Sequence, residues 1–129
     1  MTELTLKKKR YFWINMNPLN LPLPGWVSFG HRVSGVLIFV GLYWLLALLE
    51  RSLASGNTFE AYKATVSNPF AKLCLIVLAW SYLHHFCAGL RYLFMDVHWG
   101  ADLASARKSA IVVFGVSVLL TLVFAVAIW

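Results

Sequence analysis

The sequence predicts an all-α integral membrane protein, built as a bundle of three transmembrane helices. Of the 129 residues, 60% are apolar and only 12% are charged, and the mean hydropathy is +0.73. A soluble domain is nearer half apolar and a quarter charged, so this chain has too little polar surface to cover a globule in water. Three apolar runs are also long enough to cross a hydrocarbon core of roughly 30 Å as helices. These observations exclude a soluble globule, a disordered chain and a disulfide scaffold.

The first predicted span covers residues 28–50, because no charge occurs from Val33 to Leu49 and Glu50 closes the run. The second covers residues 69–95. Its apolar sequence is interrupted by polar and charged side chains, namely Lys72, Ser81, His84, His85 and Arg91. The third span covers residues 109–129 and ends on a tryptophan, which is typical of the membrane interface.

The distribution of lysine and arginine predicts the topology. Seven of these residues lie in or beside the N-terminal tail (1–27) and the second loop (96–108), against three in or beside the first loop (51–68). The positive-inside rule therefore places the tail and the second loop in the cytoplasm, the first loop in the periplasm and the C-terminus outside. The net charge of +6 is then a topology signal, and no nucleic acid is expected as a partner.

The N-terminal composition bears on the kind of membrane. Glu3 and the scarcity of serine and arginine near the start argue against a mitochondrial transit peptide. We therefore expect a bacterial cytoplasmic (inner) membrane, with lipid as an obligatory partner.

Ionisable residues inside the second span point to a function, since each costs about 2.5–3.5 kcal/mol in a membrane helix. His85 lies on a stripe with the small residues Ser81, Ala88 and Gly89, which leave space for a neighbouring helix or a flat macrocycle such as haem. His84 points roughly 100° away, among bulkier neighbours, and is the weaker ligand candidate. The alternative for His85 is a hydrogen bond across a helix interface, without any metal.

A haem with two histidine ligands needs imidazoles on facing helices. The chain offers one well-placed imidazole, so a second axial ligand would come from another subunit. The only cysteines, Cys74 and Cys87, are too few for a four-thiolate cluster or zinc site.

Polar residues also gather at the start of the first span. Ser28, Arg32 and Gly35 share one helix face, so a hydroxyl and a guanidinium converge near the membrane edge. This pair suits the carbonyl head group of a molecule whose isoprenoid tail stays in lipid. His31 is close enough to the surface to meet a haem propionate. The alternatives are that Arg32 only snorkels to the surface and that Ser28 only caps the helix.

Two segments resemble the cytochrome b556 membrane-anchor subunit family of succinate dehydrogenase. Residues 28–34, SFGHRVS, look like the family's S-x-x-H-R-x-[ST] signature, and residues 85–91, HFCAGLR, followed by Asp96, look like its H-x-x-x-G-x-R pattern. Length, three-helix layout and motif order fit over nearly the whole chain. The chain departs from the pattern at three positions, Tyr11, Tyr92 and His98.

The resemblance implies a role for each matching residue. His85 would be one axial ligand of haem b, with the other supplied by a second small membrane-anchor subunit. His31 and Arg32 would lie at the haem propionates. Ser28 with Arg32 would border the ubiquinone site, together with residues of the iron–sulfur subunit.

At the level of the complex, the resemblance implies docking of a flavoprotein subunit and an iron–sulfur subunit on the cytoplasmic side. Electrons would pass from succinate to ubiquinone, linking the tricarboxylic acid cycle to electron transport. The chain would be an anchor, with no activity by itself.

Two alternatives stay open. One is a fumarate reductase anchor that works with menaquinol. The other is a haem-free small transporter or assembly protein, in which His85 and Arg91 serve packing or proton movement. The sequence leaves open the physiological direction, the quinone species, the haem potential, and the roles of His84, Asp96 and His98.

Overall fold

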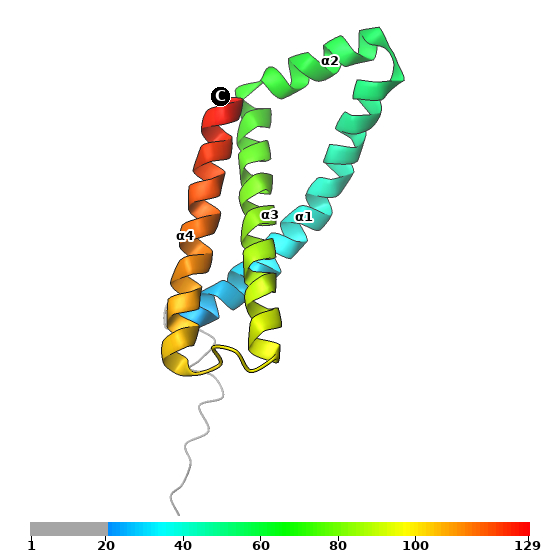
Figure 1. The fold of residues 1–129 in the computed structure, drawn as a ribbon. Coiled ribbons are helices and arrows are strands. Elements are labelled where there is room, and N and C mark those ends of the chain that lie inside the picture. Colours follow the sequence, from blue (N-terminus) through cyan, green and yellow to red (C-terminus); the bar gives the residue numbers. More distant parts are fainter. Residues whose placement is uncertain (1–20) are drawn as a thin grey trace, which may run out of the picture.

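The computed structural model describes residues 21–129, which form four helices (Figure 1). They are α1 (Leu23–Ala54), α2 (Gly56–Ser67), α3 (Pro69–Asp96) and α4 (Leu103–Ile128). Three of them, α1, α3 and α4, are long and apolar enough to cross a membrane. The described part of the chain contains no strand. The predicted all-α bundle of three spanning helices is therefore confirmed.

α3 is the central helix of the bundle. It runs beside α4, and a short connection joins the two at one end (Figure 1). α1 crosses α3 near that same end and then diverges from it, and α2 bridges the gap between α1 and α3 at the opposite end. The start of α1, the end of α3 and the start of α4 thus lie together, at the end of the bundle that the charge distribution assigns to the cytoplasm.

α1 begins earlier than the predicted span of residues 28–50. It starts at Leu23, with Pro22 as its N-cap and a proline in its first turn. Proline is tolerated there, because the first N–H groups of a helix have no partner within it. Ser28 therefore lies inside the helix and does not cap it, contrary to the alternative raised above. Of the predicted tail 1–27, residues 1–20 lie outside the described part.

The predicted first loop, residues 51–68, contains α2. The Ser55 hydroxyl accepts a hydrogen bond from the Thr58 amide (3.2 Å), and the Thr58 hydroxyl accepts one from the Ser55 amide (2.9 Å). This reciprocal pair is a capping box, which satisfies two amides at the helix start. α2 ends at Ser67, and the Asn68 side chain then caps α3 by accepting from the Phe70 amide at 2.8 Å.

α4 also begins before its predicted span of residues 109–129. The Asp102 carboxylate caps it by accepting a hydrogen bond from the Ser105 amide at 3.0 Å. That bond lowers the pKa of the Asp102 carboxyl below its usual value. The preceding turn reverses direction through two residues with positive φ, His98 (62°) and Gly100 (73°).

Small residues fill the contacts between the helices. The fully buried positions include Ser34, Ser81, Ala88, Ala110 and Ser117. Small side chains let membrane helices approach closely, where hydrophobic collapse gives no driving force. Most large apolar side chains point outward instead, so the faces of the bundle require lipid or other subunits.

Candidate functional site

A layer of imidazole rings lies where α1 crosses α3. The rings of His31 on α1 and His85 on α3 are stacked, with centroids 4.0 Å apart and planes 13° apart. Tyr92, two turns further along α3, meets the His31 ring edge-on, with centroids 5.4 Å apart. A side chain at Gly89 would contact His31 Nε2 at 3.7 Å, so this glycine keeps space open beside the ring. Both histidines are half-buried.

His85 is fixed by α1. Its Nδ1 lies 2.9 Å from the backbone carbonyl oxygen of His31 and 3.3 Å from Ser34 Oγ. Because a carbonyl oxygen only accepts hydrogen bonds, Nδ1 carries the proton and Nε2 keeps its lone pair. Gly35 leaves room for the ring, since a Cβ there would lie 3.0 Å from His85 Cε1. Nε2 makes no hydrogen bond with the residues that the structure describes, so its lone pair is free to bind a metal.

His84 has a different environment. Its side chain is 0% exposed, and neither ring nitrogen has a hydrogen-bond partner of good geometry among residues 21–129. The ring stacks on Trp80 (5.3 Å between centroids) and packs against Phe114 of α4 (5.1 Å). On its α1 side it fits against Gly30, where a Cβ would lie only 2.6 Å from His84 Nε2. Surrounded by packed side chains, this ring has no room for a macrocycle at either nitrogen.

Ser28 and Arg32 lie one turn apart near the start of α1. Arg32 is exposed and Ser28 is half-buried. Neither forms a side-chain hydrogen bond or ion pair with any residue from 21 to 129. The structure therefore brings His31 and His85 into contact but leaves Ser28 and Arg32 open to a ligand or another subunit. His31 turns toward α3, while its neighbour Arg32 points outward.

Asp96 and His98 lie at the end of α3. Asp96 is the last residue of the helix, and both side chains are exposed. Within residues 21–129, Asp96 forms no ion pair with Arg91 or Arg107.

Two contributors to the site were missed from the sequence, namely Gly30 and Ser34. They lie four residues apart on α1. The His84 ring packs against Gly30, and the Ser34 hydroxyl lies within hydrogen-bond distance of His85 Nδ1. Small residues at this spacing let two membrane helices approach closely. That spacing was the available signal, and it stands inside the segment of residues 28–34.

The haem that the resemblance implies would need a ligand from these residues. No group of three or more histidine, cysteine, aspartate or glutamate residues able to chelate a metal ion occurs among the described residues. A haem iron needs only axial ligands, because the porphyrin supplies the other four nitrogens. His85, with Nδ1 held by a carbonyl and Nε2 free, has the arrangement typical of a metal-bound histidine. The residues present fit a haem held through one axial ligand.

These features define a class of protein. The chain is a multi-pass helical membrane protein that carries stacked histidine rings where two of its spans cross. Polar groups of this kind inside a bundle mark cofactor or substrate sites.

Comparison with known proteins identifies the family. The model of the succinate dehydrogenase/fumarate reductase transmembrane subunit matches residues 7–124, and this chain belongs to that family. The chain is 30% identical over 125 residues to the succinate dehydrogenase cytochrome b556 subunit of Coxiella burnetii, covering 96% of this chain and 100% of the relative. It is 25% identical over 121 residues to the subunit of that name from Rickettsia felis, covering 94% of each chain. The Paracoccus denitrificans subunit is 28% identical over 100 residues, covering 78% of this chain and 77% of the relative. The resemblance stated from the two sequence motifs is thereby confirmed.

Proposed function

We propose that this chain is the haem b-binding membrane anchor of a succinate dehydrogenase complex in a bacterial inner membrane. The observation that carries the proposal is the His85 imidazole, whose Nδ1 is held 2.9 Å from the His31 carbonyl while Nε2 is left free. The names of the relatives, which are cytochrome b556 subunits, support the haem. By itself the chain carries no catalytic residue for succinate oxidation.

The protein's part in the haem chemistry is to hold and orient one ligand. A haem bound at His85 would supply a one-electron iron couple. The His31 carbonyl fixes the tautomer of His85 and makes its Nε2 more basic. The stacked His31 ring restricts rotation of the imidazole about its side-chain bonds, and Gly35 leaves the space that the ring occupies.

The second axial ligand comes from outside the chain. His31 lies against the His85 ring itself, and His84 is buried on a different face of α3. Neither can face His85 across a porphyrin. A second small membrane-anchor subunit is therefore the source of the opposing imidazole.

Arg32 and Ser28 would bind the polar groups of the ligands, namely a haem propionate and the quinone head group. Arg32 is an exposed cation one residue from His31, which suits both a haem propionate and a quinone carbonyl. Ser28 lies one turn earlier and adds a hydroxyl. Ubiquinone would bind here, at the cytoplasmic end of the bundle, next to docked iron–sulfur and flavoprotein subunits. The relatives' names favour succinate oxidation over fumarate reduction with menaquinol, and family membership disfavours a transporter or an assembly protein.

Arg32 provides the test of the quinone site. In the complex purified through a tagged copy of this chain, Arg32→Ala lowers succinate:ubiquinone activity about tenfold, because a charge-assisted hydrogen bond to the quinone is lost. Ser28→Ala lowers it a few-fold. Succinate oxidation by a soluble artificial acceptor stays unchanged in both variants.

Arg51→Ala, at the opposite end of α1, is the matched control and retains both activities. If Arg32→Ala lowers both activities equally, or detaches the soluble subunits, Arg32 serves assembly and the quinone assignment is wrong.

A further inference from the structure

Arg91, one of the motif residues with no role in the function proposed above, is a buried cation between α3 and α4. Its side chain is buried, with 6% of its surface exposed. Nε donates to Ser109 Oγ at 2.8 Å, and Nη2 donates to the Ala106 carbonyl at 3.2 Å. A guanidinium has five N–H donors, and these two bonds leave Nη1 without a hydrogen bond inside the described part of the chain.

Arg91 has no acidic partner among residues 21–129, and its guanidinium carbon lies 5.5 Å from the centre of the Tyr92 ring. The one ion pair found among residues 21–129 joins Lys63 to Glu60 within α2, at the opposite end of the bundle from the connection between α3 and α4. A charge held in a membrane bundle without a counter-ion is costly. The site therefore favours an anion.

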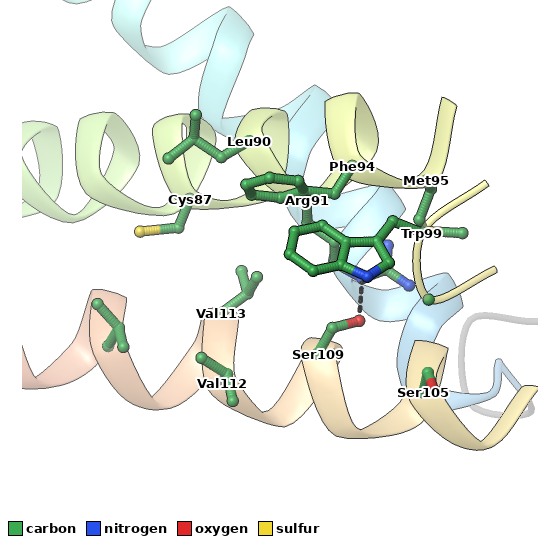
Figure 2. A pocket seen from close by; sticks show the side chains of 12 residues that line it. Cys87, Leu90, Arg91, Phe94, Met95, Trp99, Ser105, Ser109, Val112 and Val113 are labelled. Carbon is green, nitrogen blue, oxygen red and sulfur yellow. Dashed lines mark hydrogen bonds between the residues drawn. The ribbon is translucent and has the colours of Figure 1, made fainter. Parts of the chain in front are cut away.

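Arg91 lines a cavity of about 400 Å³ between α3 and α4 (Figure 2). Most of the lining is apolar, and its few polar side chains, Arg91, Ser105 and Ser109, lie toward the loop that joins the helices. Deeper in the bundle it is apolar and includes Val113 and Val116. On α3 the lining extends from Cys87 to Met95, a length of about 12 Å at the usual helical rise.

The shape of the cavity matches an amphipathic ligand that lies parallel to the helices. Its polar end is beside Trp99, which is 72% exposed and lies at the loop end of the cavity, in front of Arg91 in Figure 2. Tryptophan prefers the depth of the lipid head groups. The cavity therefore extends from head-group depth toward the middle of the bilayer.

We propose that this cavity binds an anionic phospholipid. Its phosphate would bind the Arg91 guanidinium, with the Ser105 hydroxyl as a further donor, and one acyl chain would lie along Phe94, Val112 and Val116. Basic pockets between membrane helices are suited to anionic head groups. A neutral quinone would fill the apolar part but leave the arginine charge uncompensated, so the charge favours the lipid.

The test measures lipid binding to the whole complex, purified in detergent and depleted of lipid. Native mass spectrometry follows titration with dioleoylphosphatidylglycerol and, separately, with the zwitterionic dioleoylphosphatidylcholine. The wild-type complex binds one phosphatidylglycerol about tenfold more tightly than phosphatidylcholine. Arg91→Gln weakens phosphatidylglycerol binding about tenfold and leaves phosphatidylcholine binding unchanged, while Arg91→Lys retains most of the preference.

Two further variants separate the site from general effects. Arg107→Gln removes an exposed charge of α4 that does not line the cavity, and it changes the affinity less than twofold. Val116→Phe narrows the apolar part while Arg91 stays in place, and it also weakens phosphatidylglycerol binding. The haem absorbance of each variant reports that the complex is assembled.

Three results would overturn the proposal. One is equal affinity of the wild type for the two lipids, which would mean that the negative charge of the lipid does not contribute to binding. Another is an equal loss in Arg91→Gln and Arg107→Gln, which would indicate diffuse surface attraction. The third is an absence of lipid uptake in the assembled complex, which would mean that a helix of another subunit fills the cavity.

Discussion

At the scale of single residues, Gly30 and His84 form a close contact between α1 and α3. A Cβ at residue 30 would lie 2.6 Å from His84 Nε2, and the ring cannot retreat easily because it packs on Trp80 and Phe114. We therefore expect Gly30→Ala to destabilise the complex by about 1–3 kcal/mol, as overpacking of a closed core does. Thermal unfolding of the purified complex measures this as a lower melting temperature.

The matched control is Gly115→Ala on α4, where a Cβ would meet nothing within 4 Å. Alanine exceeds glycine in helix stability by about 0.5–1 kcal/mol, so this variant is as stable as the wild type or slightly more stable. Equal melting temperatures for Gly30→Ala and Gly115→Ala would show that the contact with His84 is not tight in the assembled protein.

Much of the site was predictable at this scale, because side-chain direction follows from helical spacing. The 100° step between His84 and His85 predicts different environments for them, and in the structure His84 is fully buried while His85 is half-buried. The partner on α1 could not be read in the same way, since it depends on the angle and depth at which two helices cross. That is why Ser34 and Gly30 were missed, and why the His31 ring was expected near the surface but packs against His85.

At the scale of the elements, α2 is a short helix held by its own cap. The Ser55 and Thr58 side chains supply the capping box, and α2 has no buried residue. We expect Ser55→Ala to cost about 1 kcal/mol of local stability, which corresponds to amide exchange about fivefold faster across α2. Hydrogen–deuterium exchange with mass spectrometry resolves this peptide from α1 and α3.

Ser52→Ala is the control for α2. The Ser52 hydroxyl donates only to the Leu49 carbonyl within α1, at 2.7 Å, and its loss leaves exchange in α2 unchanged. Unchanged exchange in Ser55→Ala would mean that α2 is held by its neighbours rather than by its cap.

The spanning helices were predictable because a run of about 20 apolar residues is long enough to cross the bilayer as a helix. Their ends were not, because apolar length says nothing about the polar turns that extend a helix beyond the membrane. α1 and α4 both begin earlier than predicted, at a proline N-cap and an aspartate cap. α2 was missed because its capping box has threonine in place of the usual glutamate, and no apolar stripe marks the helix.

At the scale of the whole molecule, the chain is one part of a larger assembly. Large apolar side chains cover its outer faces, and the small residues lie inside. The His85 lone pair and the Arg32 guanidinium are left open by the described part of the chain. Family membership supplies the context, since the succinate dehydrogenase/fumarate reductase transmembrane subunit belongs to an enzyme complex.

The most direct test of the central claim, that His85 ligates haem b, is one difference spectrum. The tagged complex is purified in mild detergent, and the dithionite-reduced minus oxidised absorbance is recorded for the wild type, His85→Ala and His84→Ala. We predict a sharp b-type band in the wild type, its loss in His85→Ala and its retention in His84→Ala, with the soluble subunits present in all three. A band that survives in His85→Ala and disappears in His84→Ala would contradict the ligand assignment. No band in a wild-type complex that holds its soluble subunits would contradict the haem itself.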